Sequence, residues 1–503
     1  MNRYKDNIYT RYFILFCLLH LIIWTLLPYI SRIAMPFDTV EGIAWGNQWM
    51  LGYNKHPPLA AWLCALFYNI GGVVGIYMLA QLAIILTFFA IWKLASYYFS
   101  PLLALVSVLL LEGNLSLTLV SPNFNPTAIL APLWALTFLC YYLALKKQSV
   151  KIWLLLGLLV ALNILAKYQS IILFIVMFLF MIFTTEGRES FKKSGIYMAF
   201  LFTSVLILPH FIYSYTQGFP ELHYALKSTA STGAGAFLDH IMMPLHMLIN
   251  QVGTVALSIV IGLPLLFAKR DPNIAVKRFE FKFLLTMLSG PFIITLLLSV
   301  LTGSRMDNNW FVPYFSLIGV AIVLFARPVI TKLNITITII LLTTVLVLVP
   351  FGRYGAIVFN PYLTGKVNSK AYFPGNAIAE KVTAIWEKRY KSKLPYIAGD
   401  HYITAYVNTL SKDHPIPFMD LDLEQSAWVN KSDFLRRGGV FIWYAKNRYD
   451  VMFGYNKDTI PFHITEEYPR VIFLGVYDFT IPIMVGSSYS PVRIGIAILP
   501  PEK

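Results

Sequence analysis

The fold is decided by an apolar stretch that reads IWLLLGLLVALNILAKYQSIILFIVMFLFMIF from residue 152 to residue 183. About 20 consecutive apolar residues in a helix span the hydrocarbon core of a bilayer, and this stretch is long enough for two short crossings. Lys167-Tyr168-Gln169 interrupts it. We therefore expect two membrane helices, over 152–166 and 168–184, that are joined at a polar turn.

Similar apolar runs recur along the first 350 of the 503 residues. Hydrophobic residues make up 57% of the chain and charged residues only 13%, about half the charged share of a soluble domain. Three cysteines, all within apolar runs, cannot form a disulfide scaffold. The composition thus excludes a cytosolic enzyme, a disordered chain and a disulfide-rich domain, and it predicts a polytopic α-helical membrane protein.

Basic residues before residue 351 gather in alternate loops, which predicts the orientation. With eleven spans, 17 Lys and Arg fall on one side of the membrane and five on the other. Because positive loops stay in the cytoplasm, we expect a cytoplasmic N-terminus, and an odd number of spans (about 11–13) places the C-terminal part outside. The spans are expected at 13–30, 73–92, 101–119, 128–145, 152–166, 168–184, 195–213, 243–267, 283–301, 311–326 and 333–350.

The apolar segment 59–70 is too short to cross and is expected to lie on the outer face as an interfacial helix. Counting it as a crossing would reverse the sides of all later loops and remove the charge asymmetry. The first outer loop then runs from 31 to 72. The net charge of +15 is therefore attributed to cytoplasmic loops and membrane lipids, and nucleic acid is not expected as a partner.

The last 150 residues are richer in charge and in turn residues, which predicts two domains: a membrane domain over 1–350 and an extracytoplasmic α/β domain over 351–503. Helices are expected at 376–393 and 401–411. Short segments rich in β-branched and aromatic residues predict strands at 394–400, 438–445, 470–479 and 492–499.

The first outer loop carries two carboxylates, Asp38 and Glu41, followed by Trp45 at helical spacing. Residues three, four and seven apart share one helix face, so these side chains form a candidate site that activates a nucleophile, holds a metal or grips a sugar. A structural alternative is equally simple. An Asp-x-x-Glu sequence after a proline is also typical of a helix N-cap with its reciprocal partner.

Candidate cations lie in the predicted outer loops. Lys55 and His56 precede the interfacial helix, where they suit a lipid-linked phosphate, although a lysine there also simply reaches lipid headgroups. Lys167 would lie at bilayer depth, which costs about 2.5–3.5 kcal/mol and calls for a function or a short route to water. Arg305 stands in a polar loop with Asp307 and Asn309, which alternatively form an ordinary turn.

Together these segments resemble the bacterial GT-C glycosyltransferases. That family includes protein mannosyltransferase-like and lipid A aminoarabinose transferase-like enzymes and their galacturonosyl and galactosamine transferase relatives. The resemblance is carried by the acidic pair, by GYNKHPPL at 52–59, by GLLVALNILAKY at 157–168 and by NWFVPY at 309–314. It covers most of the chain. Asn309 replaces the histidine of the family's H-W-x-x-P stretch, and Asn123 and Asn125 occupy an outer turn that is often acidic.

The resemblance implies an inverting transfer of a sugar from a polyprenyl phosphate to an acceptor on the periplasmic face of the bacterial inner membrane. It implies that Asp38 is the acid/base or orienting carboxylate and that Glu41 supports it. The donor phosphate would face Lys55, His56, Lys167 and Arg305, and the substrates would be lined by Trp45, Tyr53, Tyr168, Asp307 and Asn309. A divalent metal is left open.

Three functional classes remain open: a glycosyltransferase, a transporter or flippase, and a structural assembly protein. The basic outer residues favour an anionic acceptor such as lipid A, and we lean towards an amino sugar as the transferred group; a protein acceptor is the alternative within the same fold. A transporter or flippase would also be polytopic, but paired repeats with broken helices near the midplane would then be expected. A structural assembly protein would tolerate replacement of the outer carboxylates.

Overall fold

The computed structural model describes residues 2–229, 237–365, 370–446, 460–481, 483 and 491–502. The chain folds into two compact units. The first, here the membrane unit, comprises Met1–Leu27, Lys55–Leu59 and Tyr77–Arg353. The second, here the sheet unit, comprises Pro28–Asn54, Ala60–Ile76 and Tyr354–Lys503, so that it combines most of the first outer loop with the C-terminal part of the chain.

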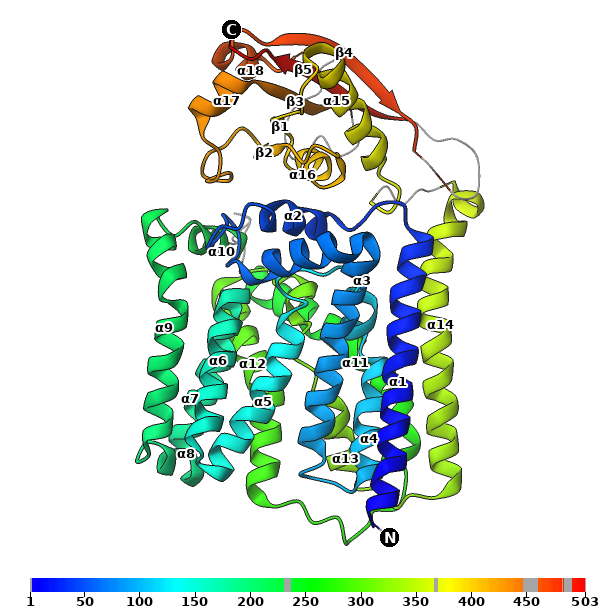
Figure 1. Ribbon diagram of the computed structural model, residues 1–503. Helices are drawn as coiled ribbons and strands as arrows, with labels where there is room; N and C mark the ends of the chain where they lie inside the picture. The colour runs from blue at the N-terminus through cyan, green and yellow to red at the C-terminus, as the bar shows by residue number, and fades with distance from the viewer. Residues whose placement is uncertain are drawn as a thin grey trace. The chain divides into compact units, whose positions relative to one another are not determined.

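Every predicted span contains a helix, and the chain is a multi-pass membrane protein (Figure 1). Among the described residues, six helices are long and apolar enough to cross a bilayer: Ile8–Ser31 within α1 (Asn2–Ser31), α3 (Leu59–Ala95), α9 (Ser194–Thr216), α11 (Asp239–Leu266), α12 (Arg278–Thr302) and α14 (Lys332–Thr364). The remaining predicted spans contain the shorter helices α4 (Pro101–Leu109), α5 (Leu130–Lys147), α6 (Val150–Ala166), α7 (Ile171–Phe183) and α13 (Ile318–Ala326).

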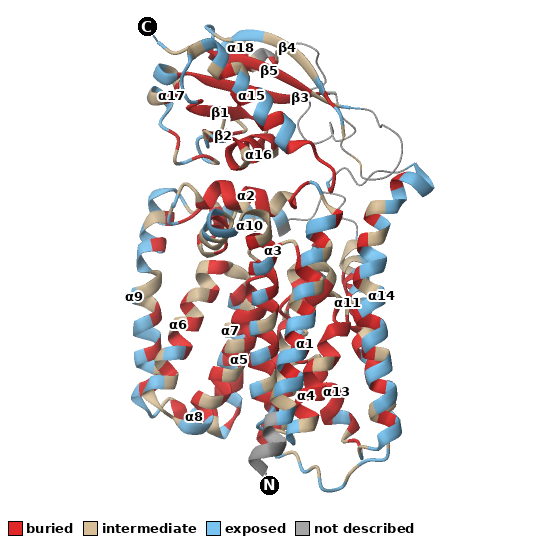
Figure 2. Cartoon of the chain, turned by 45° about the vertical axis from the view of Figure 1, so that its right-hand side comes forward, coloured by how far each residue is buried: buried red, intermediate tan, exposed pale blue. Residues whose placement is uncertain are grey.

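Large apolar side chains cover the outward faces of the long helices (Figure 2). On α9, for example, Phe200 is 75% exposed and Leu201 is 66% exposed. A continuous apolar surface of this kind is expected to contact lipid rather than water.

The basic loops of the membrane unit meet at one end of the helices, where α1 begins (Figure 1). Backbone hydrogen bonds join two of these loops, from Asp271 N–H to the Arg327 carbonyl and from Val329 N–H to the Lys269 carbonyl, each 2.7 Å long. A hydrogen bond from the Gln148 side chain to the Ser190 hydroxyl of α8 (Thr185–Ser190), 2.7 Å long, joins two further basic loops. The alternation of loops inferred from charge therefore corresponds to the arrangement of the helices.

Helix α3 is broken where the interfacial segment was expected to end. Gly72 has φ +56° and ψ −143°, a conformation open to glycine. At 1.5 Å per residue, an unbroken helix of 37 residues would be about 55 Å long, nearly twice the hydrocarbon thickness. The break leaves residues 73–95, about 35 Å of helix, as a segment of the right length to span.

The expectation of one continuous helix over 101–119 is wrong. After α4 the chain tightens into a 3₁₀ turn, η1 (Leu110–Gly113), and then a π-helical turn, η2 (Ser116–Val120). Between them, the Asn114 side chain accepts a hydrogen bond from Ser116 N–H (3.1 Å) and donates to the Phe315 carbonyl (3.3 Å). The first bond satisfies a backbone N–H at the interruption, and the second ties the interruption to the segment that precedes α13.

A buried polar cluster ties α1, α3 and η1 together inside the membrane unit. The His20 ring donates from Nδ1 to Glu112 (2.7 Å), and its Nε2 contacts the Gln81 side-chain oxygen (3.1 Å). Trp24 Nε1–H donates to the other Glu112 oxygen (2.9 Å). His20, Gln81 and Glu112 are at most 1% exposed, so the carboxylate depends on these partners.

The sheet unit contains a five-stranded mixed sheet, which confirms the predicted α/β fold of the C-terminal part. The strand order is β2-β1-β3-β5-β4, with β1 parallel to β2 and β3, and β5 antiparallel to β3 and β4. The sequence missed β2, α17 and α18. The elements are α2 (Phe37–Gly46), α15 (Gly375–Tyr390), β1 (Tyr396–Gly399), α16 (His401–Leu410), β2 (Ile416–Met419), α17 (Lys431–Arg437), β3 (Gly439–Lys446), α18 (Phe462–Glu467), β4 (Ile472–Phe479) and β5 (Val492–Leu499).

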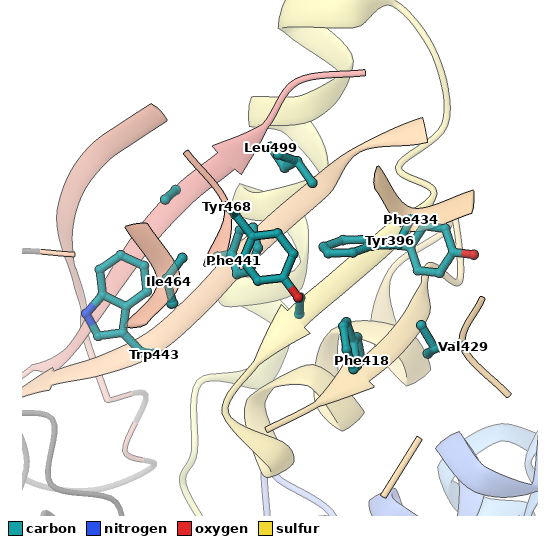
Figure 3. Packing of buried hydrophobic residues seen from close by; sticks show 11 residues of the cluster. Tyr396, Phe418, Val429, Phe434, Phe441, Trp443, Ile464, Tyr468 and Leu499 are labelled. Atoms are coloured by element: carbon teal, nitrogen blue, oxygen red, sulfur yellow. The ribbon is translucent and has the colours of Figure 1, made fainter. Parts of the chain in front are cut away.

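One face of this sheet packs on a compact aromatic core (Figure 3). Phe434 of α17 is fully buried and contacts Tyr396, Phe418 and Phe441 from three adjacent strands with ring centroids 5.3–5.8 Å apart. Aromatic pairs at this separation add to the free energy gained by burial alone. The core thereby holds the loops at the carboxyl ends of β1 and β2 in place.

We predict that replacing His20 with Ala destabilises the membrane unit far more than replacing Thr25 with Ala on the same helix. His20→Ala leaves Glu112 buried without its main partner, and breaking such a pair costs about 3–5 kcal/mol. Thr25→Ala should cost about 1 kcal/mol or less. Unfolding of both variants in detergent measures the difference, and equal losses would contradict the role assigned to the buried pair.

Candidate functional site

Helix α2 carries the predicted carboxylate pair and begins immediately after Pro36, its N-cap residue. Asp38 lies in the first turn, half-buried, and the N-cap makes no side-chain hydrogen bond. Glu41 is buried and bonds to His401 instead of to the start of its own helix. The capping alternative for Asp38 and Glu41 is therefore wrong.

His401, the first residue of α16, lies between two carboxylates. Its Nε2 bonds to Glu41, and its Nδ1 lies 3.5 Å from an oxygen of Asp420. The backbone N–H of His401 also donates to Asp420 (3.1 Å). The imidazole is 3% exposed. Because an ionised carboxylate only accepts hydrogen bonds, this arrangement favours an imidazole that donates from Nε2 to Glu41 and faces Asp420 with Nδ1 at ion-pair distance.

Aromatic rings surround this contact and include two of the predicted substrate-lining residues. Trp45 presents an edge-on contact to the His401 ring (centroids 6.3 Å apart) and stacks on Tyr53 (5.3 Å, 8° between planes). Tyr53 in turn meets Trp428 edge-on at 6.2 Å. The sheet unit thus brings Asp38, Glu41, Trp45 and Tyr53 into one region, and their roles stay predictions.

In the membrane unit, Lys55 and His56 meet a short helix that the sequence analysis did not identify, α10 (Pro220–Thr229). The Lys55 ammonium lies 6.0 Å from the Tyr224 ring centroid, and the His56 ring packs edge-on against the same ring at 5.8 Å. Such contacts hold a cation near a surface without neutralising its charge.

Lys167 lies at the predicted interruption between two membrane helices. α6 ends at Ala166, Lys167 is extended, and a 3₁₀ turn, η3 (Tyr168–Ser170), precedes α7. The ammonium donates to the Thr127 hydroxyl (2.8 Å) and lies 5.1 Å from the Trp310 ring centroid. Gln169 donates to the Trp310 carbonyl (2.7 Å), so this turn contacts η4 (Asn308–Phe311).

Tyr168, which follows Lys167 in the sequence, begins a series of polar contacts that ends at α10. Its hydroxyl bonds to His210 Nε2 on α9 (2.7 Å), and one turn further Ser214 donates to Glu221 of α10 (3.0 Å). Glu221 is 1% exposed, and burial raises the pKa of its carboxyl above the ordinary value. Sequence reasoning missed Glu221, because its pairing with α9 gives no local pattern.

The polar loop of Arg305, Asp307 and Asn309 combines an exposed cation with a structural turn. Arg305 is exposed, and Asp307 accepts a hydrogen bond from Asn309 N–H (2.7 Å) at the start of η4. Asp307 therefore caps this turn, as the structural alternative proposed. Asn309 is exposed. The loop leads directly to Trp310, which covers Lys167.

The described part of the chain contains no preformed site of the kind that the metal-binding alternative requires. Among these residues, no three or more His, Cys, Asp or Glu side chains are grouped so that they would hold an ion. The acidic pair and the cations also belong to different units: Asp38 and Glu41 to the sheet unit, and Lys55, His56, Lys167 and Arg305 to the membrane unit.

Comparison with known proteins gives a family match over part of the chain and a fold. Residues 55–213 match the family model described as dolichyl-phosphate-mannose-protein mannosyltransferase. No curated protein sequence matches the chain. Among solved structures, ArnT from Cupriavidus metallidurans is similar over 98% of this chain at 13% identity. The TM-score is 0.59 for apo ArnT, of which 99% is covered, and 0.61 for ArnT bound to undecaprenyl phosphate, of which 100% is covered.

The chain has the GT-C glycosyltransferase fold. This confirms the resemblance drawn from the sequence. The apo oligosaccharyltransferase of Archaeoglobus fulgidus shares the GT-C fold more distantly, at 12% identity and a TM-score of 0.51 over 96% of this chain and 74% of its own. The family match includes Lys55, His56 and Lys167 and excludes Asp38 and Arg305.

Asp400 provides a pH-dependent test of the geometry around His401. It caps α16 by accepting hydrogen bonds from the N–H groups of Tyr402 (3.1 Å) and Ile403 (3.0 Å). Burial, aided by the charge of Asp420, raises its pKa to about 6 from the ordinary 3.8. The folded state thus holds this proton more tightly than the unfolded state does, and stability falls as pH rises from about 4 to about 6.

We predict that Asp400→Asn removes this loss, because Asn caps a helix about as well and carries no charge. The variant should match the wild type near pH 4 and exceed its unfolding temperature near pH 7.5. Thermal unfolding of both proteins in the same detergent at the two pH values provides the measurement. A wild type that is the more stable protein near pH 7.5 would contradict the assigned environment of Asp400.

Proposed function

We propose that this protein is a membrane glycosyltransferase that moves a sugar from a polyprenyl-phosphate donor to an acceptor at the outer face of the inner membrane. The observation that carries the proposal is the grouping of Lys55, His56, Lys167 and Tyr168 around α9, α10 and η4 in a GT-C fold. The solved structure of ArnT with undecaprenyl phosphate supports a lipid phosphate as the carrier.

Departure of a polyprenyl phosphate leaves negative charge on the phosphate oxygens, and positioned cations stabilise that charge. The ammonium groups of Lys55 and Lys167 lie against aromatic rings, where a cation–π contact positions a cation for an anionic ligand. Arg305 is exposed on the loop that leads to Trp310 and supplies a planar group suited to bidentate phosphate binding. His56 packs on the same tyrosine as Lys55.

Asp38 is the proposed acid/base or orienting carboxylate, with Glu41 as its support. An acceptor hydroxyl needs a base to become nucleophilic, whereas an acceptor phosphate is already a nucleophile and needs only orientation. Asp38 is half-buried in the first turn of α2, close to the positive end of the helix dipole. Trp45 and Tyr53 supply stacked rings of the kind that line carbohydrate sites.

We propose lipid A as the acceptor and an amino sugar as the transferred group. The cations of the predicted outer loops favour an anionic acceptor. A protein acceptor is the second candidate, favoured by the description of the matching family model. The proposed orientation has a cytoplasmic N-terminus and a periplasmic C-terminal part, supported by the gathering of basic loops at one end of the membrane unit.

We predict that Asp38→Asn abolishes sugar transfer without loss of expression or membrane insertion. The amide preserves size but neither accepts a proton nor carries the charge that orients an acceptor. The assay uses purified protein in detergent, a polyprenyl-phosphate amino sugar, and lipid A or an acceptor peptide in parallel. Release of polyprenyl phosphate and mass increase of either acceptor are both measured.

The matched control is Asn47→Asp, which changes an amide to a carboxylate just beyond α2 and should retain transfer. Full activity of Asp38→Asn at normal abundance would exclude the catalytic role. Modification of the peptide alone would replace lipid A with protein as the acceptor, and no release of polyprenyl phosphate by the wild type would exclude the proposed reaction.

We further predict that Lys55→Ala, Lys167→Ala and Arg305→Ala each lower kcat/KM for the donor by about 10²–10³-fold, as does loss of an oxyanion donor. Lys55→Arg and Arg305→Lys should keep part of the activity, since they retain charge with altered hydrogen-bond geometry. Lys227→Ala, which removes an exposed lysine of α10, is the control and should stay near the wild type. Unchanged turnover in two of the three Ala variants would remove support for the phosphate site.

A further inference from the structure

Helix α2 lies beside α16 (Figures 1 and 2). Two contacts with α16 flank Asp38 on α2. On the side that precedes Asp38, Phe37 stacks on Tyr402 (5.0 Å, 25°) and meets Tyr406 edge-on (5.7 Å). One turn after Asp38, Glu41 bonds to His401. All of these residues belong to the sheet unit. The segment before α2 is also fixed, because the Tyr406 hydroxyl donates to the Met35 carbonyl (2.6 Å).

We propose that His401 is a positioning residue for the carboxylate pair on α2, held in turn by Asp420. This inference deepens the proposed function and rests on it. It assigns to the C-terminal part of the chain a direct share in the geometry of the transfer reaction, through Glu41, rather than a role confined to folding.

The charges of the three groups support one another. An imidazole that donates to Glu41 from Nε2 and faces Asp420 from Nδ1 carries a positive charge between two negative ones. Glu41 and His401 are shielded from water, with 6% and 3% exposure, whereas Asp420 is partly exposed. In such surroundings a charged group that loses its partner cannot recover the lost free energy from solvent, so Glu41 would turn away or take up a proton.

The same geometry excludes His401 from direct proton transfer with a substrate. Both of its nitrogens face carboxylates, and its ring packs at a right angle to Trp45. Asp38, by contrast, is half-buried and lies one turn from Glu41. His401 therefore acts through α2, by fixing the direction in which the helix presents Asp38.

The titratable groups facing His401 are Glu41 from α2, Asp400 and Asp420 from the loops after β1 and β2, and the adjacent Tyr402. A change at His401 therefore acts on a set of coupled charges. For this reason the test compares kcat and KM at one pH and uses a double-variant cycle, which separates the His401–Glu41 coupling from independent effects.

The experiment measures donor turnover by the full-length protein in detergent for His401→Gln, Glu41→Gln and the double variant. His401→Gln keeps a similar size and one donor but loses the charge. We expect kcat to fall about 100-fold, the scale of a misplacement of about 1 Å, while KM for the donor stays at the wild-type value. The double variant should be no slower than the slower single variant. His414→Gln, in the same unit with its ring bonded to the Asn408 carbonyl, is the matched control and should keep wild-type kcat.

Wild-type kcat in folded His401→Gln would overturn the proposal, as would independent, multiplying losses in the double variant. If His401→Gln fails to fold, Asp420→Asn decides. This variant weakens the contact between His401 Nδ1 and residue 420. We expect a fall in kcat at unchanged KM. An unchanged kcat would overturn the proposal. Absence of transfer by the wild type would instead refute the proposed function itself, so the two failures are distinguishable.

Discussion

The contact between Glu41 and His401 joins segments 360 residues apart and fixes the helix that carries the candidate catalytic carboxylate. A helix of ten residues has little stability of its own, so α2 depends on tertiary contacts for its place. They include contacts with α16, through His401, Tyr402 and Tyr406, besides close packing on the first part of α3. α16 in turn is fixed by its cap Asp400 and by Asp420, which follow two parallel strands. The sheet therefore acts as the support for α2.

A different constraint governs the membrane unit, where every interruption of a helix needs partners for its backbone. The chain meets this need with polar side chains: Asn114 at the break after α4, and Thr127 and Trp310 around the break at Lys167. The interruptions place charged and polar groups at the ends of short helices rather than on lipid-facing surfaces. Sites for an anionic lipid headgroup are expected at such positions, because a cation there reaches an anionic ligand without crossing the hydrocarbon.

The sequence predicted the membrane helices because their length and apolar content are local properties. The interruption at Lys167 and the end of the interfacial segment near Gly72 were also visible, since a charge and a glycine mark them. The break after α4 was not, because the bonds of Asn114 that stabilise it reach a distant segment. α10 was not predicted because it is short and polar. Glu221 was not predicted because its partner, Ser214, lies on a different helix, α9.

At the candidate site, spacing alone placed Asp38, Glu41 and Trp45 on one helix, but it left capping open as an alternative. Only the partner of Glu41 decides between the two, and that partner, His401, opens a helix near the other end of the chain. Nothing in the sequence next to Glu41 or His401 indicated this pairing. Long-range electrostatic contacts of this kind are invisible to local patterns, which is why the supporting residues of the site were missed.

Hydrogen exchange of the α2 amides tests the central claim most directly, since it reports how firmly the helix is held. The exchange rates over residues 37–46 are compared between the wild type and His401→Gln in the same detergent, with α11 as the internal reference. We predict faster exchange across α2 in the variant and unchanged exchange in α11. Equal protection of α2 in the two proteins would show that His401 does not hold the helix, and it would contradict the account.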